Sequence, residues 1–226
     1  MRTHSRERAV QVIELSVSYD FICPWCWIGH LNLASGIRAA NLPVPVSMTY
    51  APFELNPTMP AVGMDRREYR TAKFGSWVRS QGMDAQVAAT GLAAGAQFNF
   101  ERVSRTPNTR LAHQLMQYAL SVGDARKTEA LYESIFAAYF SEGRDIGLIG
   151  TLVELAAKAG FNAAATEDTL LQGRGLAEVL AAQRLTQQQG VRSVPTVFIA
   201  GDAISGAQPP AVFANALRAA LERSTA

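Results

Sequence analysis

The chain is poor in cysteine and in charge, and it has no long apolar run. Two cysteines in 226 residues cannot build the framework of disulfides that staples small secreted domains. With 48% hydrophobic and 18% charged residues, the chain can instead bury an ordinary globular core. A net charge of +2 is too small to indicate binding to nucleic acid or to an anionic membrane. No run of about 18 apolar residues exists, so no transmembrane helix is expected.

Residues 1–9 form a polar stretch that we predict to be an N-terminal tail. Arg2, Arg6 and Arg8 imitate the basic start of a signal peptide, but no apolar segment and no cleavage site follow them. We therefore predict a cytoplasmic protein, in a compartment where most thiols are kept reduced.

Both cysteines lie in one short motif, Cys23-Pro24-Trp25-Cys26 (the CPWC motif), between a strand-like run and a helix-like run. Two thiols at this spacing can close a small disulfide ring when the second lies one turn into a helix. Pro24 suits that first turn, because its missing N–H would have no partner there. The free N–H groups and the dipole of a helix N-terminus favour the reactive thiolate of Cys23.

Other uses of the cysteine pair have less support. A structural zinc site needs four ligands, and the three histidines, His4, His30 and His113, form no matching pair, so we predict no metal. A purely structural disulfide would close too short a loop to restrain the unfolded chain. Two buried, inert cysteines are a further alternative. A CxxC directly after a strand is typical of a thioredoxin-like redox motif.

Hydrophobic periodicity places the elements around the motif. Residues 12–20 alternate between apolar and polar, which predicts a strand. A helix should run from about residue 24 to about residue 40, and residues 46–50 alternate again as a second strand. The order strand, helix, strand implies a parallel pair joined by a crossover.

Between about residues 65 and 190 no convincing strand is found, and amphipathic helices are expected instead. Asp145 and Asn162 are candidate N-caps, and residues 86–100 have no clear pattern. The helical spacing is carried by three sets of apolar residues: Leu111, Leu115 and Tyr118; Leu131, Ile135 and Tyr139; Leu148, Leu152 and Leu155.

The strand signal returns after Gly190. Residues 196–199 and 203–205 predict a hairpin, and Pro210 opens a last helix. A thioredoxin fold has this order once an insertion is removed. We therefore predict an α/β thioredoxin fold with a large all-helical insertion between the second strand and the helix preceding the C-terminal hairpin. We divide the chain into a thioredoxin-like domain, residues 10–60 and 175–222, and an inserted helical domain, residues 61–174.

Val194-Pro195-Thr196 is the second informative motif. A proline at the head of a strand lacks a ladder donor, and most X–Pro bonds are trans. In thioredoxin folds, however, the proline that opens this strand is cis and lies beside the CxxC. The resemblance of this element order to a thioredoxin fold therefore implies a cis Pro195 and a Val194 backbone free to pair with an extended substrate. The alternative is a plain proline at a strand start.

The CPWC motif, the late Val194-Pro195-Thr196 and the helical block resemble the DsbA-like branch of the thioredoxin superfamily. Residues 53–57 (FELNP) and 107–113 (PNTRLAH) are similar to FrnE-like thiol oxidoreductases. The resemblance covers about residues 10–220. The 2-hydroxychromene-2-carboxylate isomerases and kappa-class glutathione transferases are related, but typically carry serine at the position of Cys23. Some FrnE-like proteins carry a second cysteine pair, which this chain lacks.

The resemblance implies that Cys23 is the nucleophile and that Cys26 resolves the mixed disulfide. Pro24 and Trp25 would set the redox poise, and Val194, Pro195 and Thr196 would support the site.

Three further residues are weaker candidates. Asp20 could influence proton transfer or could be a solvated acid at a strand end. His113 could be catalytic or could be a packing residue of its helix. Glu54 lies in a loop that is near the site in the resembled family. Trp27 is expected in the core.

The sequence leaves three candidate functions open. The first is a thiol–disulfide oxidoreductase acting on protein or small-molecule disulfides. The second is a glutathione-dependent transferase or isomerase, and the third is a peptide-binding module. No bound cofactor is expected, glutathione is a possible cosubstrate, and the related proteins imply a homodimer. The substrate and the direction of electron flow stay open.

Overall fold

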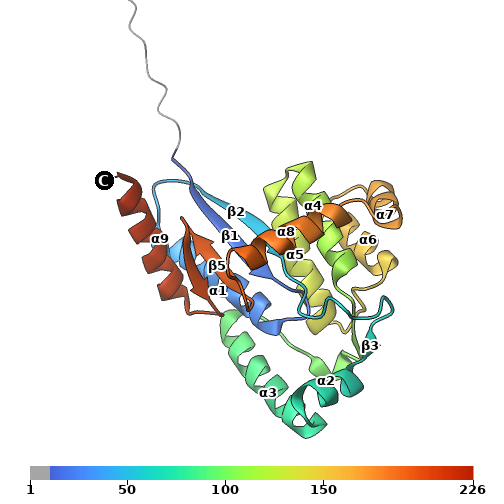
Figure 1. The fold of residues 1–226 in the computed structure, drawn as a ribbon. Helices are drawn as coiled ribbons and strands as arrows, with labels where there is room; N and C mark the ends of the chain where they lie inside the picture. The colour runs from blue at the N-terminus through green and yellow to red at the C-terminus, as the bar shows by residue number, and fades with distance from the viewer. Residues whose placement is uncertain (1–10, 226) are drawn as a thin grey trace, which may run out of the picture.

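The protein is described by a computed structural model over residues 11–225, so the predicted polar tail, residues 1–9, lies outside the described residues. A four-stranded sheet in the order β2-β1-β5-β6 forms the centre of the fold (Figure 1). β1 and β2 are parallel, as predicted, and β5 is antiparallel to both β1 and β6. The strands are β1 (Ile13–Tyr19), β2 (Val46–Pro52), β5 (Thr196–Ile199) and β6 (Asp202–Ser205).

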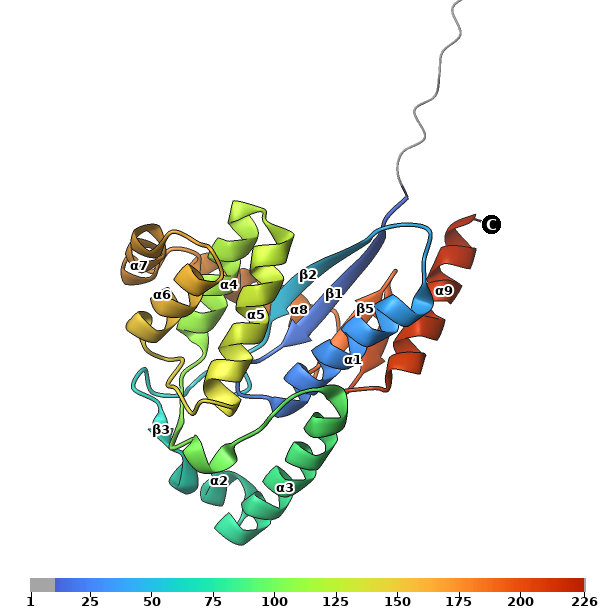
Figure 2. The ribbon, with the colours of Figure 1, turned by 180° about the vertical axis from the view of Figure 1, so that it is seen from behind.

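Helix α1 (Pro24–Ala40) follows β1 and begins and ends where the sequence predicts. It stops at Asn41, whose φ of 49° lies in the left-handed region. α1 lies beside α9 (Pro210–Thr225) on one face of the sheet, and α8 (Leu176–Gln188) lies on the other (Figures 1 and 2). A Cβ at Gly36 would lie 2.7 Å from Phe213 Cβ. The close packing of α1 on α9 therefore requires a glycine at this position.

The predicted helical block is present between β2 and α8. α4 to α7 gather beside the β2 edge, whereas α2 and α3 lie near the start of α1 (Figure 2). The elements are α2 (Arg66–Phe74), α3 (Trp77–Ala94), the short 3₁₀ turn η1 (Phe100–Arg102), α4 (Arg110–Val122), α5 (Ala125–Phe140), α6 (Ile149–Lys158) and α7 (Ala163–Leu171).

The thioredoxin fold with a helical insertion is confirmed, with one addition. The insertion contains a two-residue ladder between β3 (Met64–Asp65) and β4 (Arg105–Thr106), so it is not entirely helical. Such a short ladder leaves no alternation for a sequence pattern to detect. The division into residues 10–60 with 175–222 and residues 61–174 stays our prediction.

Of the two N-caps predicted in the helical block, the structure confirms one and contradicts the other. Asn162 caps α7 as predicted, because its side chain accepts a hydrogen bond from Ala165 N. The prediction for Asp145 is wrong, since its carboxylate accepts from Gly147 N and α6 begins after Leu148. α3 escaped the sequence pattern because its buried stripe is Ser80, Asp84, Val87 and Gly91, with only one large apolar side chain.

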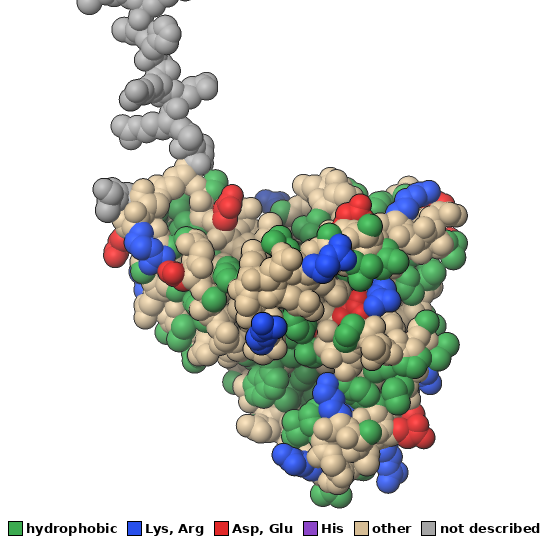
Figure 3. Space-filling view, in the orientation of Figure 1, with side chains coloured by type: hydrophobic (Ala, Val, Ile, Leu, Met, Phe, Trp, Pro, Cys, Tyr) green, Lys and Arg blue, Asp and Glu red, His purple; other side chains and the backbone are tan. Residues whose placement is uncertain are grey.

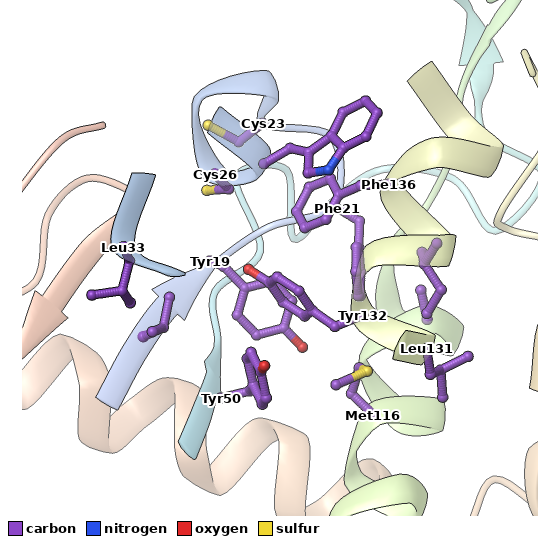
Figure 4. Packing of buried hydrophobic residues seen from close by; sticks show 14 of the residues in the cluster. Tyr19, Phe21, Cys23, Cys26, Leu33, Tyr50, Met116, Leu131, Tyr132 and Phe136 are labelled. Carbon is purple, nitrogen blue, oxygen red and sulfur yellow. The ribbon is translucent and has the colours of Figure 1, made fainter. Parts of the chain in front are cut away.

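One aromatic cluster joins the sheet to the inserted helices (Figure 4). Tyr19 at the end of β1 and Tyr132 on α5 have ring centroids 4.8 Å apart, and Phe21 lies 4.9 Å from Phe136. Trp27 is buried as expected and packs on Phe136 and on two further phenylalanines, Phe98 and Phe140. The insertion and the sheet therefore share one core.

None of the helices in residues 11–225 combines the length and the apolar composition that crossing a bilayer requires. On the face seen in Figure 3, Lys and Arg side chains are interspersed with Asp and Glu side chains.

Candidate active site

The two cysteines occupy the start of α1. Cys23 is the N-cap residue, with extended backbone at φ −93° and ψ 107°, and Cys26 N donates to Cys23 O at 3.0 Å. Both are free thiols, 7% and 0% exposed respectively. The first turn, residues 24–27, contains no acidic side chain, so the positive end of the helix is not neutralised from within. This geometry can stabilise negative charge on the Cys23 sulfur.

The fold brings Val194 and Pro195 to the same place. The Val194–Pro195 peptide bond is cis, and the Cys23 thiol donates to Val194 O at 3.5 Å. A Cβ at Gly29 of α1 would lie 3.0 Å from Pro195 Cγ, so a glycine at this position lets the proline pack directly against the helix. Thr196 is buried and donates from its hydroxyl to Ser193 O at 2.8 Å.

The two thiols differ in environment. Burial raises the pKa of Cys26 well above its ordinary value, and the hydrogen bond with Cys23 adds to the effect. Cys26 therefore stays protonated in the reduced protein at neutral pH. Cys23 lies further out, beside a cavity, and is the thiol that a substrate can reach.

Asp20 and His113 lie together beneath the motif. Asp20 is fully buried, and one carboxylate oxygen accepts from Leu55 N at 2.7 Å. Its other oxygen lies 3.4 Å from His113 Nε2. The structure therefore excludes a solvated strand-end acid at Asp20. It also gives His113 packing contacts on Tyr19 and Phe21, and places the carboxyl group of Asp20 beside its ring.

Glu54 holds the loop that follows β2 in place through side-chain hydrogen bonds. Its buried carboxylate accepts from Arg110 Nε at 3.0 Å and Nη2 at 2.9 Å, and from Gln183 Nε2 at 3.0 Å. The hydrogen bond with Glu54 raises the pKa of Arg110. These contacts tie the loop to α4 and α8, and none of them reaches a cysteine.

A cavity of about 240 Å³ opens beside Cys23, with Pro24 and Trp25 in its lining. Its far wall comes from α2 and α3, including Arg70 and Lys73. Asp84 pairs with both Arg66 and Arg70, at 2.8 and 2.9 Å, which leaves an excess of positive charge in the wall. Burial lowers the pKa of Arg70.

The sequence analysis did not predict that residues of α2 and α3 line a cavity beside Cys23. The only signal was the run of cationic residues from Arg66 to Lys73, which by itself resembles any solvated helix face.

The sequence profile of the DSBA-like thioredoxin domain matches residues 14–218. The chain belongs to the DsbA-like thioredoxin family.

Similar proteins cover nearly the whole chain. The uncharacterized protein YwbO of Bacillus subtilis is 28% identical over 207 residues, which are 91% of this chain and 96% of that protein. The crystal structure of a "probable DsbA oxidoreductase" from Streptomyces coelicolor is 27% identical with a TM-score of 0.84, and the match covers 93% of this chain and 90% of that one. The cytosolic disulfide reductase DsbM of Pseudomonas aeruginosa, solved with GSH, shares the fold at 20% identity and a TM-score of 0.65, over 92% and 99% of the two chains.

One set of metal-ligand side chains occurs in residues 11–225 of this DsbA-like protein. Ligand atoms of His30, Glu129 and Glu133 lie within 4.8 Å of one another. His30 Nε2 is 3.2 Å from Glu133 Oε1, and this hydrogen bond lowers the pKa of Glu133. A hydrogen bond between α1 and α5 accounts for the approach of His30 and Glu133, and neither cysteine takes part in it.

Proposed function

We propose that this DsbA-like protein is a thiol–disulfide oxidoreductase with Cys23 as nucleophile and Cys26 as resolving thiol. The observation that carries the proposal is the position of Cys23 at the N-cap of α1, beside the Val194 carbonyl and above a fully buried Cys26. Neighbouring DsbA-like structures include disulfide oxidoreductases.

The reaction has two exchange steps. The Cys23 thiolate attacks one sulfur of a substrate disulfide, a mixed disulfide forms, and the other substrate sulfur leaves as a thiolate. Cys26 then loses its proton and attacks the Cys23 sulfur, which expels the second substrate thiolate. The substrate gains two electrons and the protein ends with a Cys23–Cys26 disulfide. Run in reverse, the same steps oxidise a dithiol.

The Val194 backbone is proposed to hold the substrate. Its carbonyl lies 3.5 Å from the Cys23 sulfur, so an extended substrate segment paired with Val194 would have its sulfur next to the nucleophile. Pro195 supports this position through its packing on Gly29.

Two serine variants test the assignment. With a small disulfide, Cys26→Ser should accumulate a mixed disulfide at Cys23, visible as an adduct in the mass of the intact protein. Cys23→Ser should form no adduct and should lose insulin-reducing activity. Insulin reduction by Cys23→Ser at the wild-type rate would contradict the proposal, since no buried Cys26 could replace the lost nucleophile.

Glutathione is the second candidate that an observation favours, as a cosubstrate rather than a bound cofactor. The cavity beside Cys23 carries Arg70 and Lys73, and glutathione brings two carboxylates close to its sulfur. On the face shown in Figure 3, the end of the molecule formed by α2 and α3 carries mostly Lys and Arg among its charged side chains.

The test compares glutathione disulfide with its tetraethyl ester, in which all four carboxylates are blocked. Lys73→Gln should raise the KM for glutathione disulfide and leave the KM for the ester unchanged, whereas the surface variant Lys158→Gln should affect neither. Equal effects of Lys73→Gln on both substrates would remove the argument for glutathione. The direction of electron flow follows from the reduction potential of the Cys23/Cys26 pair measured against glutathione.

A further inference from the structure

A histidine and two glutamates meet where α1 lies against α5. One ligand atom from each of His30, Glu129 and Glu133 lies within 4.8 Å of the other two. His30 belongs to α1, and the two glutamates are four residues apart on one face of α5. The hydrogen bond between His30 Nε2 and Glu133 Oε1 accounts for one of these approaches. It does not account for the position of Glu129.

The two carboxylates are only partly neutralised by their surroundings. Like charges at this spacing on a helix repel each other, and in residues 11–225 neither carboxylate forms an ion pair with a lysine or an arginine. Lys127 of α5 pairs with Asp124 instead. The charge of Arg38 acts on Glu133 from α1, but its guanidinium donates to Ser35 Oγ at 2.9 Å. An excess of negative charge therefore lies beside the imidazole.

His30 is the buried member of the set. Its side chain is completely buried, and its ring packs on Tyr132 and Tyr50, with centroids 4.8 and 6.4 Å away. Figure 4 shows these two tyrosines together below Cys26. The packing fixes the ring with Nε2 toward the glutamates.

The second ring nitrogen of His30 leaves the tautomer open. Nδ1 is buried and has no hydrogen-bond partner in residues 11–225, so no contact there holds the ring proton on one particular nitrogen. When the proton is on Nδ1, Nε2 presents its lone pair to the carboxylates. A neutral imidazole in this form is a metal ligand.

The set can be reached from solvent. The side chain of Glu133 is 45% exposed, and Glu129 is exposed. Glu129 also lines a cavity of about 510 Å³ together with Thr128, Tyr50 and residues of α1 and β2. An ion can therefore approach from this side, and the Glu129 side chain has room to turn toward it.

The donor set suits Zn²⁺. Imidazole nitrogen and carboxylate oxygen bind Zn²⁺ at about 2.0–2.2 Å, so two ligands of a tetrahedral ion lie roughly 3.3 Å apart. The 3.2 Å between His30 Nε2 and Glu133 Oε1 matches this spacing. Rotation of the exposed Glu129 side chain can bring the third ligand atom from within 4.8 Å to the same spacing. Ca²⁺ and Mg²⁺ prefer sites made of oxygen alone.

We propose that His30, Glu129 and Glu133 bind a divalent transition-metal ion of the Zn²⁺ type and so tie α1 to α5. Three protein ligands leave a coordination position for water, and the two carboxylates balance the charge of the ion. The site is independent of the proposed thiol–disulfide function, because no thiol belongs to it. The sequence predicted no metal, since His30 and Glu133 are 103 positions apart and form no motif of short spacing.

The test measures Zn²⁺ binding without a contribution from the thiols, because a reduced CxxC pair also binds this metal. The protein used is the oxidised wild type, or Cys23→Ser/Cys26→Ser if the disulfide does not form. Isothermal titration calorimetry should show one equivalent of Zn²⁺ bound. The Tm should rise with the concentration of Zn²⁺, and Mg²⁺ should not compete.

Glu129→Gln is the decisive variant, because this side chain is exposed and the substitution keeps its shape. In Glu129→Gln and in Glu133→Gln the Kd for Zn²⁺ should rise by at least about tenfold, and the rise in Tm with Zn²⁺ should shrink. The matched control is Glu154→Gln, whose carboxylate pairs with Arg144 and Lys158 at the surface. Its Kd should equal that of the parent protein.

An equal Kd for Zn²⁺ in Glu129→Gln and in the control would overturn the inference, because the metal would then bind elsewhere, for example at His4. Absence of Zn²⁺ binding by the parent protein at millimolar concentration would overturn it as well. Both results would leave the proposed function intact, since insulin reduction by the cysteine variants tests that function separately.

Discussion

The contacts of Glu54 give the sharpest stability prediction. This carboxylate is 2% exposed and receives two hydrogen bonds from Arg110 and one from Gln183. Glu54→Gln keeps the shape of the side chain but replaces one oxygen with an NH₂ group. That NH₂ group faces guanidinium donors, so it cannot accept from them.

The magnitude follows from the number and the exposure of the bonds lost. A hydrogen bond to a charged group contributes about 1.5–3 kcal/mol, and the substitution removes at least one such bond and weakens the second. The Arg110 side chain is 35% exposed, so water partly replaces the carboxylate. We expect a loss of about 2–3 kcal/mol, which corresponds to a fall in Tm of roughly 5–10 °C for a chain of this size.

The assay is thermal unfolding of the reduced protein followed by circular dichroism. Glu154→Gln is the matched control, because Glu154 pairs with Arg144 and Lys158 at the surface, where its side chain is 53% exposed. Its Tm should not change measurably. The double variant Glu54→Gln/Arg110→Gln should lose little more than Glu54→Gln alone. A Tm for Glu54→Gln equal to that of the control would refute the reasoning.

Two further predictions concern packing and pH. Gly36→Ala should destabilise the protein by about 1–3 kcal/mol, because the added methyl meets Phe213. Gly82→Ala in α3 should stabilise the protein by about 0.5–1 kcal/mol, because nothing lies within 4 Å of the added methyl. Denaturant unfolding measures the free energy of unfolding of both variants. A Gly36→Ala variant more stable than the wild type would contradict the close packing of α1 on α9. The folded pKa of Cys26 lies above that of an unfolded thiol, so its contribution to stability is complete below about pH 8.5 and is lost as pH rises toward the folded pKa. Between neutral pH and about pH 10, the free energy of unfolding should therefore fall more for the reduced wild type than for reduced Cys26→Ser. Parallel curves of this free energy against pH for the two proteins would contradict the raised pKa of Cys26.

The sequence alone determined the elements whose signals are local. The alternation in residues 12–20 predicted β1, and Pro24 marked the start of α1, which places Cys23 at its N-cap and Cys26 in its first turn. The helices around Leu115, Ile135 and Leu152 were also visible, since each buries an apolar stripe of regular period. These features depend on neighbours a few residues away, so the residue pattern records them directly.

Other features were decided only by tertiary structure. α3 buries a polar stripe against Arg66 and Arg70, a partnership that no hydrophobic pattern records. The contact of Cys23 with Val194 spans 171 positions of the chain. The cationic wall of the cavity beside Cys23 exists because α2 and α3 fold back against the start of α1.

Asp20 illustrates the difference most clearly. From the sequence, Asp20 could equally be a solvated acid or a residue that influences proton transfer, because a local pattern contains no information about burial. Its burial follows from the arrival of Leu55 from the loop after β2 and of His113 from α4. The chain by itself therefore determined where the thiols lie and which helix carries them. Packing between distant segments decided which side chains surround Cys26. The reason is that desolvation and charge pairing depend on distance in space and not on distance along the chain.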